Sequence, residues 1–418
     1  MVWHSPTEIY DGVVEHHVIK IGDFTTVNDA VIKNVQVGYE TTGTLNKDRS
    51  NAILIPAPVT GSSHFAGSSK RNPRVNHGYW DSIIGPGKPL DTNKYFLVSV
   101  EALCAIAAED HCEDVGHERL TTGPASIDPD TGKPYGKTFP LIQFRDLVHV
   151  QKRVLDELKI TKLHAVAGFS AGGAQALEWA AAPPLPVERV VSVAALAWPT
   201  PYGMAKVSAW REAIMLDPKW KEGNYYDSPE GPPIHGLALA FRLFLTDITG
   251  PSEFDNKFGR RWADSEKDPA LAMEHKYGVY QHLDSKAAKN AATIDANSFM
   301  YMTRALEAFS LGITRENREG APRLQDAAEL ITVPVLLVSS KNDQLALPSY
   351  VKRTAQILEG QGKYVKHFEL EGDRGHMNGT FALTSPGVEE NRRKAKKLMK
   401  TFLSNELLEI DQEEAMAS

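Results

Sequence analysis

A serine stands between glycines at residues 168–172, Gly-Phe-Ser-Ala-Gly, and this spacing can support nucleophilic chemistry. The apolar run at 163–167 predicts a short buried strand before it, and residues 173–182 predict a helix after it. A turn this sharp strains the serine backbone and leaves no room for a Cβ atom at the flanking positions. Strand, G-x-S-x-G and helix together are typical of a nucleophile elbow, which presents the Ser170 hydroxyl at the positive end of the helix. The alternative is an ordinary glycine-rich turn.

A serine hydroxyl becomes a good nucleophile only when an oriented imidazole takes its proton. Two later residues could complete a catalytic triad with Ser170, because each of them follows a predicted strand. Asp343 comes after the strand at 333–339, and His376 comes after the strand at 366–370. The chain order Ser, Asp, His is the order that accompanies a nucleophile elbow. We therefore predict Ser170 as nucleophile, His376 as general base and Asp343 as the carboxylate that orients it.

Asp343 and His376 could also have purely structural roles. Asp343 could cap the helix that follows it, and His376 could be an ordinary loop residue. Asp373 competes for the role of the acid, but it is too close in sequence to His376 to face the far ring nitrogen easily. The oxyanion that forms during acyl transfer needs backbone donors, and we predict the amides of Ala171 and Val59. Val59 is preferred to its neighbour because Pro58 has no N–H.

The elements that must position these residues alternate between strands and helices. A helix is predicted at 144–158 from its apolar spacing. Strands are predicted at 17–21, 35–40, 51–55, 95–100, 163–167, 189–197, 333–339 and 366–370. Apolar strands that alternate with helices indicate a mostly parallel sheet covered on both faces, and therefore an α/β fold.

Residues 200–320 break this pattern, because they contain almost no strand-like runs. Amphipathic helices are predicted at 207–216, 236–246 and 298–310. We interpret residues 200–320 as a helical lid inserted into an α/β core made of residues 1–199 and 321–418. A lid in this position would lie over the carboxyl ends of the strands, where open α/β sheets bind their ligands. A basic amphipathic helix at 389–403 and an acidic tail end the chain.

Composition excludes several classes of function. The chain has 418 residues, a formal net charge of −7 and a pI near 6.1, which argue against nucleic acid or an anionic membrane as the main partner. No apolar run has the length of a membrane span, and we find no signal peptide. Two cysteines, Cys104 and Cys112, lie eight residues apart; they could pair, but reduced thiols in a cytoplasmic protein are the preferred interpretation. No distinctive metal-ligand spacing is present, and no metal is predicted.

Several longer motifs are more specific than the pentapeptide. They are Thr60-Gly-Ser-Ser-His64, Ile84-Gly-Pro-Gly-Lys88, Thr122-Gly-Pro124, Thr131-Gly-Lys-Pro-Tyr-Gly136, Gln175-Ala-Leu-Glu-Trp-Ala180 and Asp295-Ala-Asn-Ser298. Together they resemble the homoserine O-acetyltransferase group of the α/β-hydrolase superfamily over residues 35–385. The resemblance implies the α/β-hydrolase fold, a homodimer and ping-pong acyl transfer through Ser170. It also implies Arg211 as a carboxylate contact for the substrate.

The sequence departs from the family pattern at the residue after the predicted base. The family has Gly-His-Asp, whereas this chain has Gly375-His376-Met377. The family aspartate is thought to meet the amino group of the acceptor, and the thioether of Met377 has no charge for that contact. Ala57 and Thr293 also differ from the family residues at their positions. Met377 is therefore predicted to line the substrate site without binding an ammonium group.

From the sequence we predict hydrolysis of a small acyl ester through an acyl-Ser170 intermediate. The alternative is O-acyl transfer from an acyl-CoA to an alcohol, with acyl-CoA as a co-substrate and no bound cofactor in either case. A third hypothesis, a non-catalytic binding protein on a hydrolase fold, is disfavoured because no triad member is missing. The predicted partners are small molecules, with no nucleic acid and no membrane.

Overall fold

The computed structural model describes residues 9–69, 77–105, 121–311, 324–383, 386–404 and 406. Its centre is a sheet of nine strands among the described residues, in the order β11-β10-β9-β8-β3-β5-β2-β1-β4. The strands of this sheet are β1 (Val13–Thr25), β2 (Val31–Thr42), β3 (Ala52–Pro56), β4 (Ser68–Ser69), β5 (Phe96–Val100), β8 (Ala165–Phe169), β9 (Val190–Val193), β10 (Val335–Ser340) and β11 (Val365–Leu370). A separate two-stranded sheet pairs β6 (Ile127–Asp128) with β7 (Lys133–Pro134).

The sheet is parallel from β5 to β11 and antiparallel where β2 joins β5 and β1 joins β2, and β4 pairs in parallel with β1 at the far edge. β3 pairs in parallel with both β5 and β8, and the parallel run continues through β9, β10 and β11. The hairpin of β1 and β2 joins it antiparallel to β5. Because parallel strands end at the same edge, the loops that follow β3, β8, β10 and β11 meet there.

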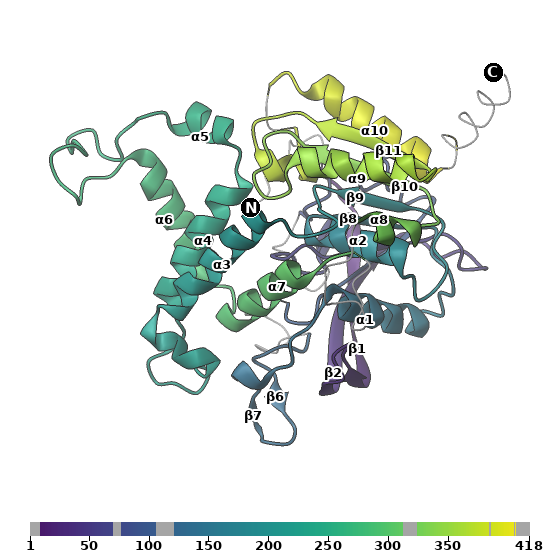
Figure 1. Ribbon diagram of the computed structural model, residues 1–418, viewed down its shortest axis with the longest axis horizontal. Helices are drawn as coiled ribbons and strands as arrows, with labels where there is room; N and C mark the ends of the chain where they lie inside the picture. Colours follow the sequence, from purple (N-terminus) through teal and green to yellow (C-terminus); the bar gives the residue numbers. More distant parts are fainter. Residues whose placement is uncertain are drawn as a thin grey trace.

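Both faces of the sheet are covered at its centre, which explains why β3 and β8 are buried at every position, whereas most residues of the outlying strand β1 are exposed or half-buried. Leu54 points into one hydrophobic cluster, whereas Ile53 and Ile55 point into the other, and all three are fully buried. On the Leu54 face lie α1 (Phe144–Glu157), α2 (Ala171–Ala181) and α9 (Pro348–Gly360), and on the opposite face lies α10 (Glu389–Leu403). Figure 1 shows α10 and α1 on opposite sides of the strands. The predicted fold class is confirmed.

One predicted strand is shorter than expected. The apolar run at 189–197 predicts strand to Ala197, but β9 ends at Val193. The next residue, Ala194, has a φ of 47°, a left-handed conformation that an extended strand cannot contain. Ala195 and Leu196 then leave the sheet and line a cavity beside Ser170.

Between β9 and β10 the described residues form helices and add no strand to the central sheet. We call the described residues 200–311 of this region the helical insertion. Its elements are α3 (Pro201–Met215), η2 (Pro218–Gly223), α4 (Ile234–Ile248), α5 (Pro251–Phe258), α6 (Gly278–Ala291) and α7 (Ala296–Ala308); α8 (Leu324–Glu329) follows it. In Figure 1 helices α3 to α6 project to the left of the sheet, whereas α7 lies between them and α1.

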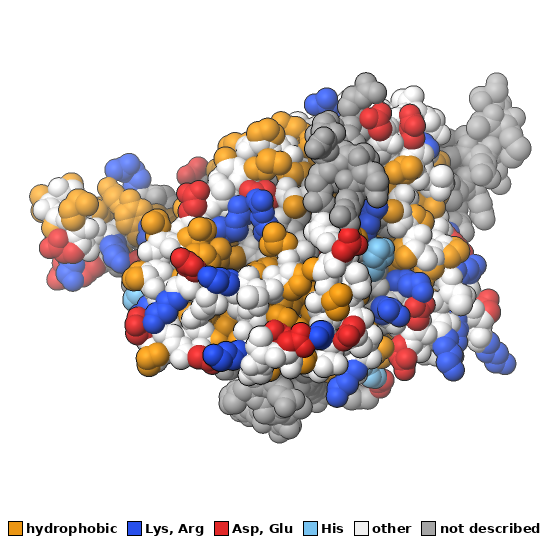
Figure 2. Space-filling model, turned by 60° about the horizontal axis from the view of Figure 1, so that its bottom comes forward, with side chains coloured by type: hydrophobic (Ala, Val, Ile, Leu, Met, Phe, Trp, Pro, Cys, Tyr) orange, Lys and Arg blue, Asp and Glu red, His pale blue; other side chains and the backbone are white. Residues whose placement is uncertain are grey.

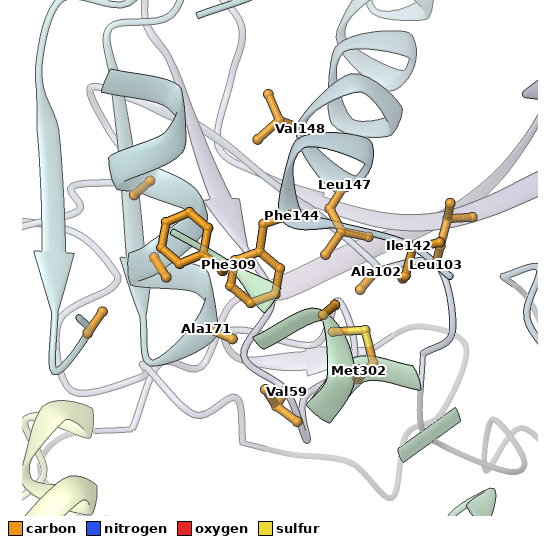
Figure 3. Packing of buried hydrophobic residues seen from close by; sticks show 14 of the residues in the cluster. Val59, Ala102, Leu103, Ile142, Phe144, Leu147, Val148, Ala171, Met302 and Phe309 are labelled. Carbon is orange, nitrogen blue, oxygen red and sulfur yellow. The ribbon is translucent and has the colours of Figure 1, made fainter. Parts of the chain in front are cut away.

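The helix α7 connects the helical insertion to the core. Phe309, just after α7, stacks on Phe144 of α1 with ring centroids 5.1 Å apart, and Met302 of α7 packs in the same cluster (Figure 3). Asp295 caps the start of α7, since its carboxylate accepts hydrogen bonds from the Ser298 amide and from the Tyr225 hydroxyl. The Asp295-Ala-Asn-Ser298 motif therefore has a visible structural role, which is to fix α7.

The surface has no large area of one charge on the face shown in Figure 2, where acidic and basic side chains alternate around apolar patches. Within the described residues, no helix combines the length and the apolar character that a membrane crossing requires. The same residues contain no group of three His, Cys, Asp or Glu side chains arranged to hold a metal ion. Cys104 is buried as a free thiol, and burial raises its pKa. Cys112 lies outside the described residues.

Candidate active site

Ser170 lies in the turn between β8 and α2, and its backbone is strained. Its φ of 57° and ψ of −126° fall in a region that residues with a side chain rarely adopt. The flanking glycines make this turn possible. A Cβ at Gly168 would overlap the carbonyl oxygen of Gly172, and a Cβ at Gly172 would overlap the carbonyl oxygen of Pro56 at the end of β3. The sequence therefore needs glycine at both positions because backbone atoms, which cannot move aside, occupy the space.

We expect Gly172→Ala to lower the free energy of unfolding by about 1–3 kcal/mol, the usual range for forcing a methyl group into a packed interior. The matched control is Gly360→Ala, because a Cβ at Gly360 meets no atom within 4 Å. Urea unfolding of the two variants measures the difference. Equal unfolding midpoints for the two variants would show that the turn tolerates a side chain and would contradict this account of the glycine.

Three side chains from three loops meet at the carboxyl edge of the sheet. His376 Nε2 lies 2.9 Å from Ser170 Oγ, and His376 Nδ1 lies 2.8 Å from Asp343 Oδ2. The Asp343 side chain is fully buried, and that of His376 is 4% exposed. These distances allow the Ser170 hydroxyl to donate to Nε2 while Nδ1–H donates to the carboxylate. The arrangement is the geometry of an activated serine nucleophile.

The backbone around Asp343 fixes its carboxylate. Oδ1 accepts hydrogen bonds from the amides of Leu345 and Ala346, each at 2.8 Å, which leaves Oδ2 for the imidazole. Two amide donors satisfy a carboxylate that is removed from water. Asp373, the competing acid, faces elsewhere: its Oδ2 accepts from Asn256 Nδ2 at 2.9 Å. The structure therefore brings Asp343, and not Asp373, to His376.

The two predicted oxyanion donors also lie together. Ala171 is the first residue of α2, so its N–H has no acceptor within the helix. No acceptor is found for the Val59 amide in the part of the chain that the structure describes. Figure 3 shows Val59 just below Ala171 at the start of α2. Gln175 of α2 holds the early loop there, because its Nε2 donates to the carbonyl oxygen of Ala57 at 3.2 Å.

Two cavities meet at Ser170 and His376. The first, which we call the alanine-lined cavity, has a volume of about 60 Å³. Its wall is mainly small and apolar and includes Ala171, Ala174, Ala194, Ala195, Trp198, Val207 and Phe309. The second, which we call the basic cavity, has a volume of about 340 Å³ and runs between the elbow and helices α4, α5 and α6. Its wall includes Val59, Tyr79, Phe244, Lys257, Lys286, Arg374 and Met377. Each cavity can hold one half of an ester that is cleaved at Ser170.

The structure places the two predicted substrate contacts differently. Met377 lines the basic cavity directly after His376. Arg211 lines neither cavity at Ser170; it borders a separate hollow near η2 and α7 and forms an ion pair with Glu307 at 2.8 Å. The described geometry therefore gives Arg211 a protein carboxylate as its partner and does not bring it to the triad.

Sequence reasoning missed the cationic residues of the basic cavity. Lys257 and Lys286 lie on α5 and α6, and nothing in their local sequence distinguishes them from other surface lysines. Arg374 could have been found, because it stands two residues before the predicted base. The segment that contains His111 and His117, whose spacing predicts no metal site, lies outside the described residues.

Comparison with known proteins shows the family to which the chain belongs. Residues 121–380 match the family described as the alpha/beta hydrolase fold. The chain is 36% identical over 361 residues to a homoserine O-acetyltransferase of Methanococcoides burtonii, covering 86% of this chain and 69% of that protein. Among solved structures it resembles an esterase named E22, with 36% identity, a TM-score of 0.81 and coverage of 93% of this chain and 100% of that one. It also resembles a homoserine O-acetyltransferase from Bacillus anthracis, with 31% identity, a TM-score of 0.82 and coverage of 94% of this chain and 98% of that one.

Proposed function

Because this chain belongs to the homoserine O-acetyltransferase group of the α/β-hydrolase family, we propose that it transfers a short acyl group, through an intermediate on Ser170, from an acyl-CoA to an alcohol. The chain is an enzyme of the α/β-hydrolase class, and acyl-CoA enters as a co-substrate. The observation that carries the proposal is the hydrogen-bonded series Asp343, His376 and Ser170 at the junction of two cavities. From the sequence alone we predicted hydrolysis. We now prefer acyl transfer, because the relative found by sequence comparison is named as an acetyltransferase.

The first half of the reaction forms the acyl-enzyme. Ser170 Oγ attacks the thioester carbonyl while its proton passes to His376 Nε2, and Asp343 stabilises the imidazolium through Nδ1–H. The amides of Val59 and Ala171 donate to the oxyanion of the tetrahedral intermediate. When the intermediate collapses, the C–S bond breaks and the thiolate of CoA takes the proton from His376. The acyl group then remains on Ser170 as an ester.

The second half repeats these steps with an alcohol. His376 removes the proton of the alcohol, whose oxygen attacks the acyl carbon of the Ser170 ester. The new ester leaves when the bond to Oγ breaks, and Ser170 recovers its proton from His376. We propose that the helical insertion acts as a lid over these steps, since α4, α5 and α6 line the basic cavity that contains Ser170. Assembly as a homodimer and a cytoplasmic location are likewise proposed on the family resemblance and the composition.

Hydrolysis of a small acyl ester is the second candidate, and a specific residue favours it. Met377, beside the catalytic histidine, gives the basic cavity no carboxylate at this point to hold an amino-acid acceptor. Water would then remove the acyl group from Ser170. The structural similarity to the esterase E22 supports this alternative. The two candidates share the acyl-Ser170 intermediate and differ only in the molecule that attacks it.

Product analysis separates them. The enzyme is supplied with acetyl-CoA, with and without a panel of alcohols, and both the released CoA and the acetylated products are measured. For transfer, we expect an alcohol to accelerate CoA release and an acetyl ester to form in equal amount. CoA release that no alcohol changes, with free acetate as the product, would support hydrolysis instead. CoA release that persists in Ser170→Ala would contradict both candidates.

We expect homoserine not to accelerate the loss of the acyl group from Ser170. Its ammonium group would lie beside His376 in a cavity whose wall carries Lys257, Lys286 and Arg374, and a charge without a partner is costly where it loses contact with water. The Met377 thioether offers only a weak acceptor for that group. Stopped-flow measurement of acyl-enzyme decay, with and without millimolar homoserine, gives the answer directly. If homoserine greatly accelerated the decay of the acyl-enzyme in the unchanged protein, this expectation would be wrong and homoserine would be an acceptor.

Two variants sharpen this test. Met377→Asp adds a carboxylate beside the histidine and should introduce some dependence on homoserine. Met377→Leu is the matched control, since it keeps the volume and the neutrality of the side chain. It should behave like the unchanged protein. If Leu and Asp had the same effect, the charge at this position would not control the choice of acceptor.

A further inference from the structure

The wall of the basic cavity carries an excess of positive charge. Among the described residues that line it, Lys257, Lys286 and Arg374 are cations, whereas Glu253 is the one carboxylate. These residues come from α5, α6 and the loop before His376, three segments far apart in the sequence. The cavity continues from them to Ser170, and Phe241 and Phe244 form part of the same wall. A molecule that fills it therefore meets an apolar surface and a cluster of cations.

Arg374 is the most buried member of this cluster, and its hydrogen-bonding capacity is only partly used. Its side chain is 11% exposed, and Nε lies 3.6 Å from Glu253 Oε2. Nη1 is buried and has no acceptor among the described residues. A buried donor on a charged group that lacks a partner is costly, and an anion in the cavity would remove that cost.

Neither lysine forms an ion pair with a carboxylate within the described part of the chain. Lys286 is half-buried, and its pKa is lowered by burial and then by the charges of Lys257, Lys289 and Arg374, with a smaller opposing effect from the charge of Glu253. The Nζ of Lys257 lies 5.4 Å from the centre of the Phe258 ring, and no carboxylate pairs with it. Like charges held near one another destabilise the empty cavity, and a bound anion would stabilise it.

We infer that the basic cavity binds an anionic group, a phosphate or a carboxylate, of a substrate whose acyl bond lies at Ser170, with Lys257, Lys286 and Arg374 as the recognition residues. This inference rests on the proposed function. It divides the substrate into a short acyl group in the alanine-lined cavity and a longer, partly apolar, acidic portion in the basic cavity. The anion has two chemical sources, the phosphates of the acyl-CoA donor or an acidic group on the acceptor alcohol.

Paired substrates distinguish these sources. For the donor, acetyl-CoA is compared with S-acetylpantetheine, which has the same thioester and no phosphate. For the acceptor, 3-hydroxybutyrate is compared with its neutral methyl ester. In the unchanged protein, the charged member of at least one pair should have the higher kcat/KM.

The variant that tests the cluster is Lys257→Gln combined with Lys286→Gln. These lysines are suitable because neither is fully buried and neither forms an ion pair in the described residues. We expect the ratio of kcat/KM for the charged and neutral members of the affected pair to fall on the order of tenfold, through KM. The control is Lys397→Gln on α10, an exposed lysine on the other side of the sheet, which makes one of the two charge changes without altering the cavity.

The outcomes are distinct. A falling ratio for the donor pair assigns the cavity to the phosphates of CoA, and a falling ratio for the acceptor pair assigns it to an acidic alcohol. Ratios that stay constant in both pairs, while p-nitrophenyl acetate still acylates Ser170, would overturn this inference and leave the proposed function intact. If p-nitrophenyl acetate does not acylate Ser170 in the unchanged protein, the proposed function itself fails.

Discussion

Replacement of Ser170 by alanine should lower kcat about 10⁶-fold, and His376→Ala should have a similar effect, as in other triads that act as a unit. The reason is geometric: Oγ and Nε2 are 2.9 Å apart, so one variant removes the atom that bonds to the acyl group and the other removes the base that takes its proton. Steady-state release of p-nitrophenol from p-nitrophenyl acetate and of CoA from acetyl-CoA measures the loss.

A change in activity has to be separated from a change in folding. Ser208→Ala is the matched serine control, since the Ser208 hydroxyl on α3 donates to the carbonyl oxygen of Ala205 in its own helix. This variant should keep its activity. Thermal unfolding of Ser170→Ala should show a folded protein with a single cooperative transition. A folded Ser170→Ala enzyme with more than a few per cent of the original activity would contradict the role of this serine.

Asp343→Asn should lower kcat about 10⁴-fold, because the amide leaves the imidazole in place but favours the wrong tautomer. The carboxylate accepts from His376 Nδ1 at 2.8 Å and is fully buried, so water cannot replace it. Asp373→Asn provides the matched comparison, since Asp373 lies three residues before the base and faces Asn256. It should retain most of the activity. The opposite ranking of these two variants would move the role of the acid to Asp373.

Much of the fold could be predicted from the sequence because local patterns determined it. Strands buried on both faces must be apolar throughout, so the runs that became β3, β8 and β10 were visible before the structure. The helix at 389–403 is found with the predicted bounds. The end of β9 could not be predicted, since the left-handed φ of Ala194 follows from its surroundings and not from its residue type.

The candidate triad was also accessible from the sequence, because topology restricts where its members can stand. Each of Ser170, Asp343 and His376 follows a strand, and parallel strands bring such positions to one edge of the sheet. The residues that contact the substrate were harder to predict from the sequence. Arg211 was assigned by resemblance alone, and its ion pair with Glu307 depends on how α3 packs against α7. The lysines of the basic cavity depend in the same way on the packing of α5 and α6.

Whether the enzyme transfers or hydrolyses the acyl group was also difficult to predict from the sequence. From the sequence, hydrolysis was favoured mainly by Met377, a single residue beside the base. The relatives by sequence support transfer, and the solved structures at similar identity include both an esterase and an acetyltransferase. Both reactions use the same acyl-Ser170 intermediate. Membership of the family therefore does not show whether water or an alcohol attacks that intermediate. The distinction depends on the polar contacts of one cavity.

The central claim is that Ser170 carries the acyl group, and mass spectrometry of the intact protein tests it most directly. The enzyme is mixed with acetyl-CoA or with p-nitrophenyl acetate, quenched in acid within milliseconds to seconds, weighed and digested. We predict a mass increase of one acetyl group, located on the peptide that contains Ser170, and no such increase in Ser170→Ala. Turnover without any acetylated Ser170 at any quench time, or an acetyl group that persists on another residue in Ser170→Ala, would contradict the account.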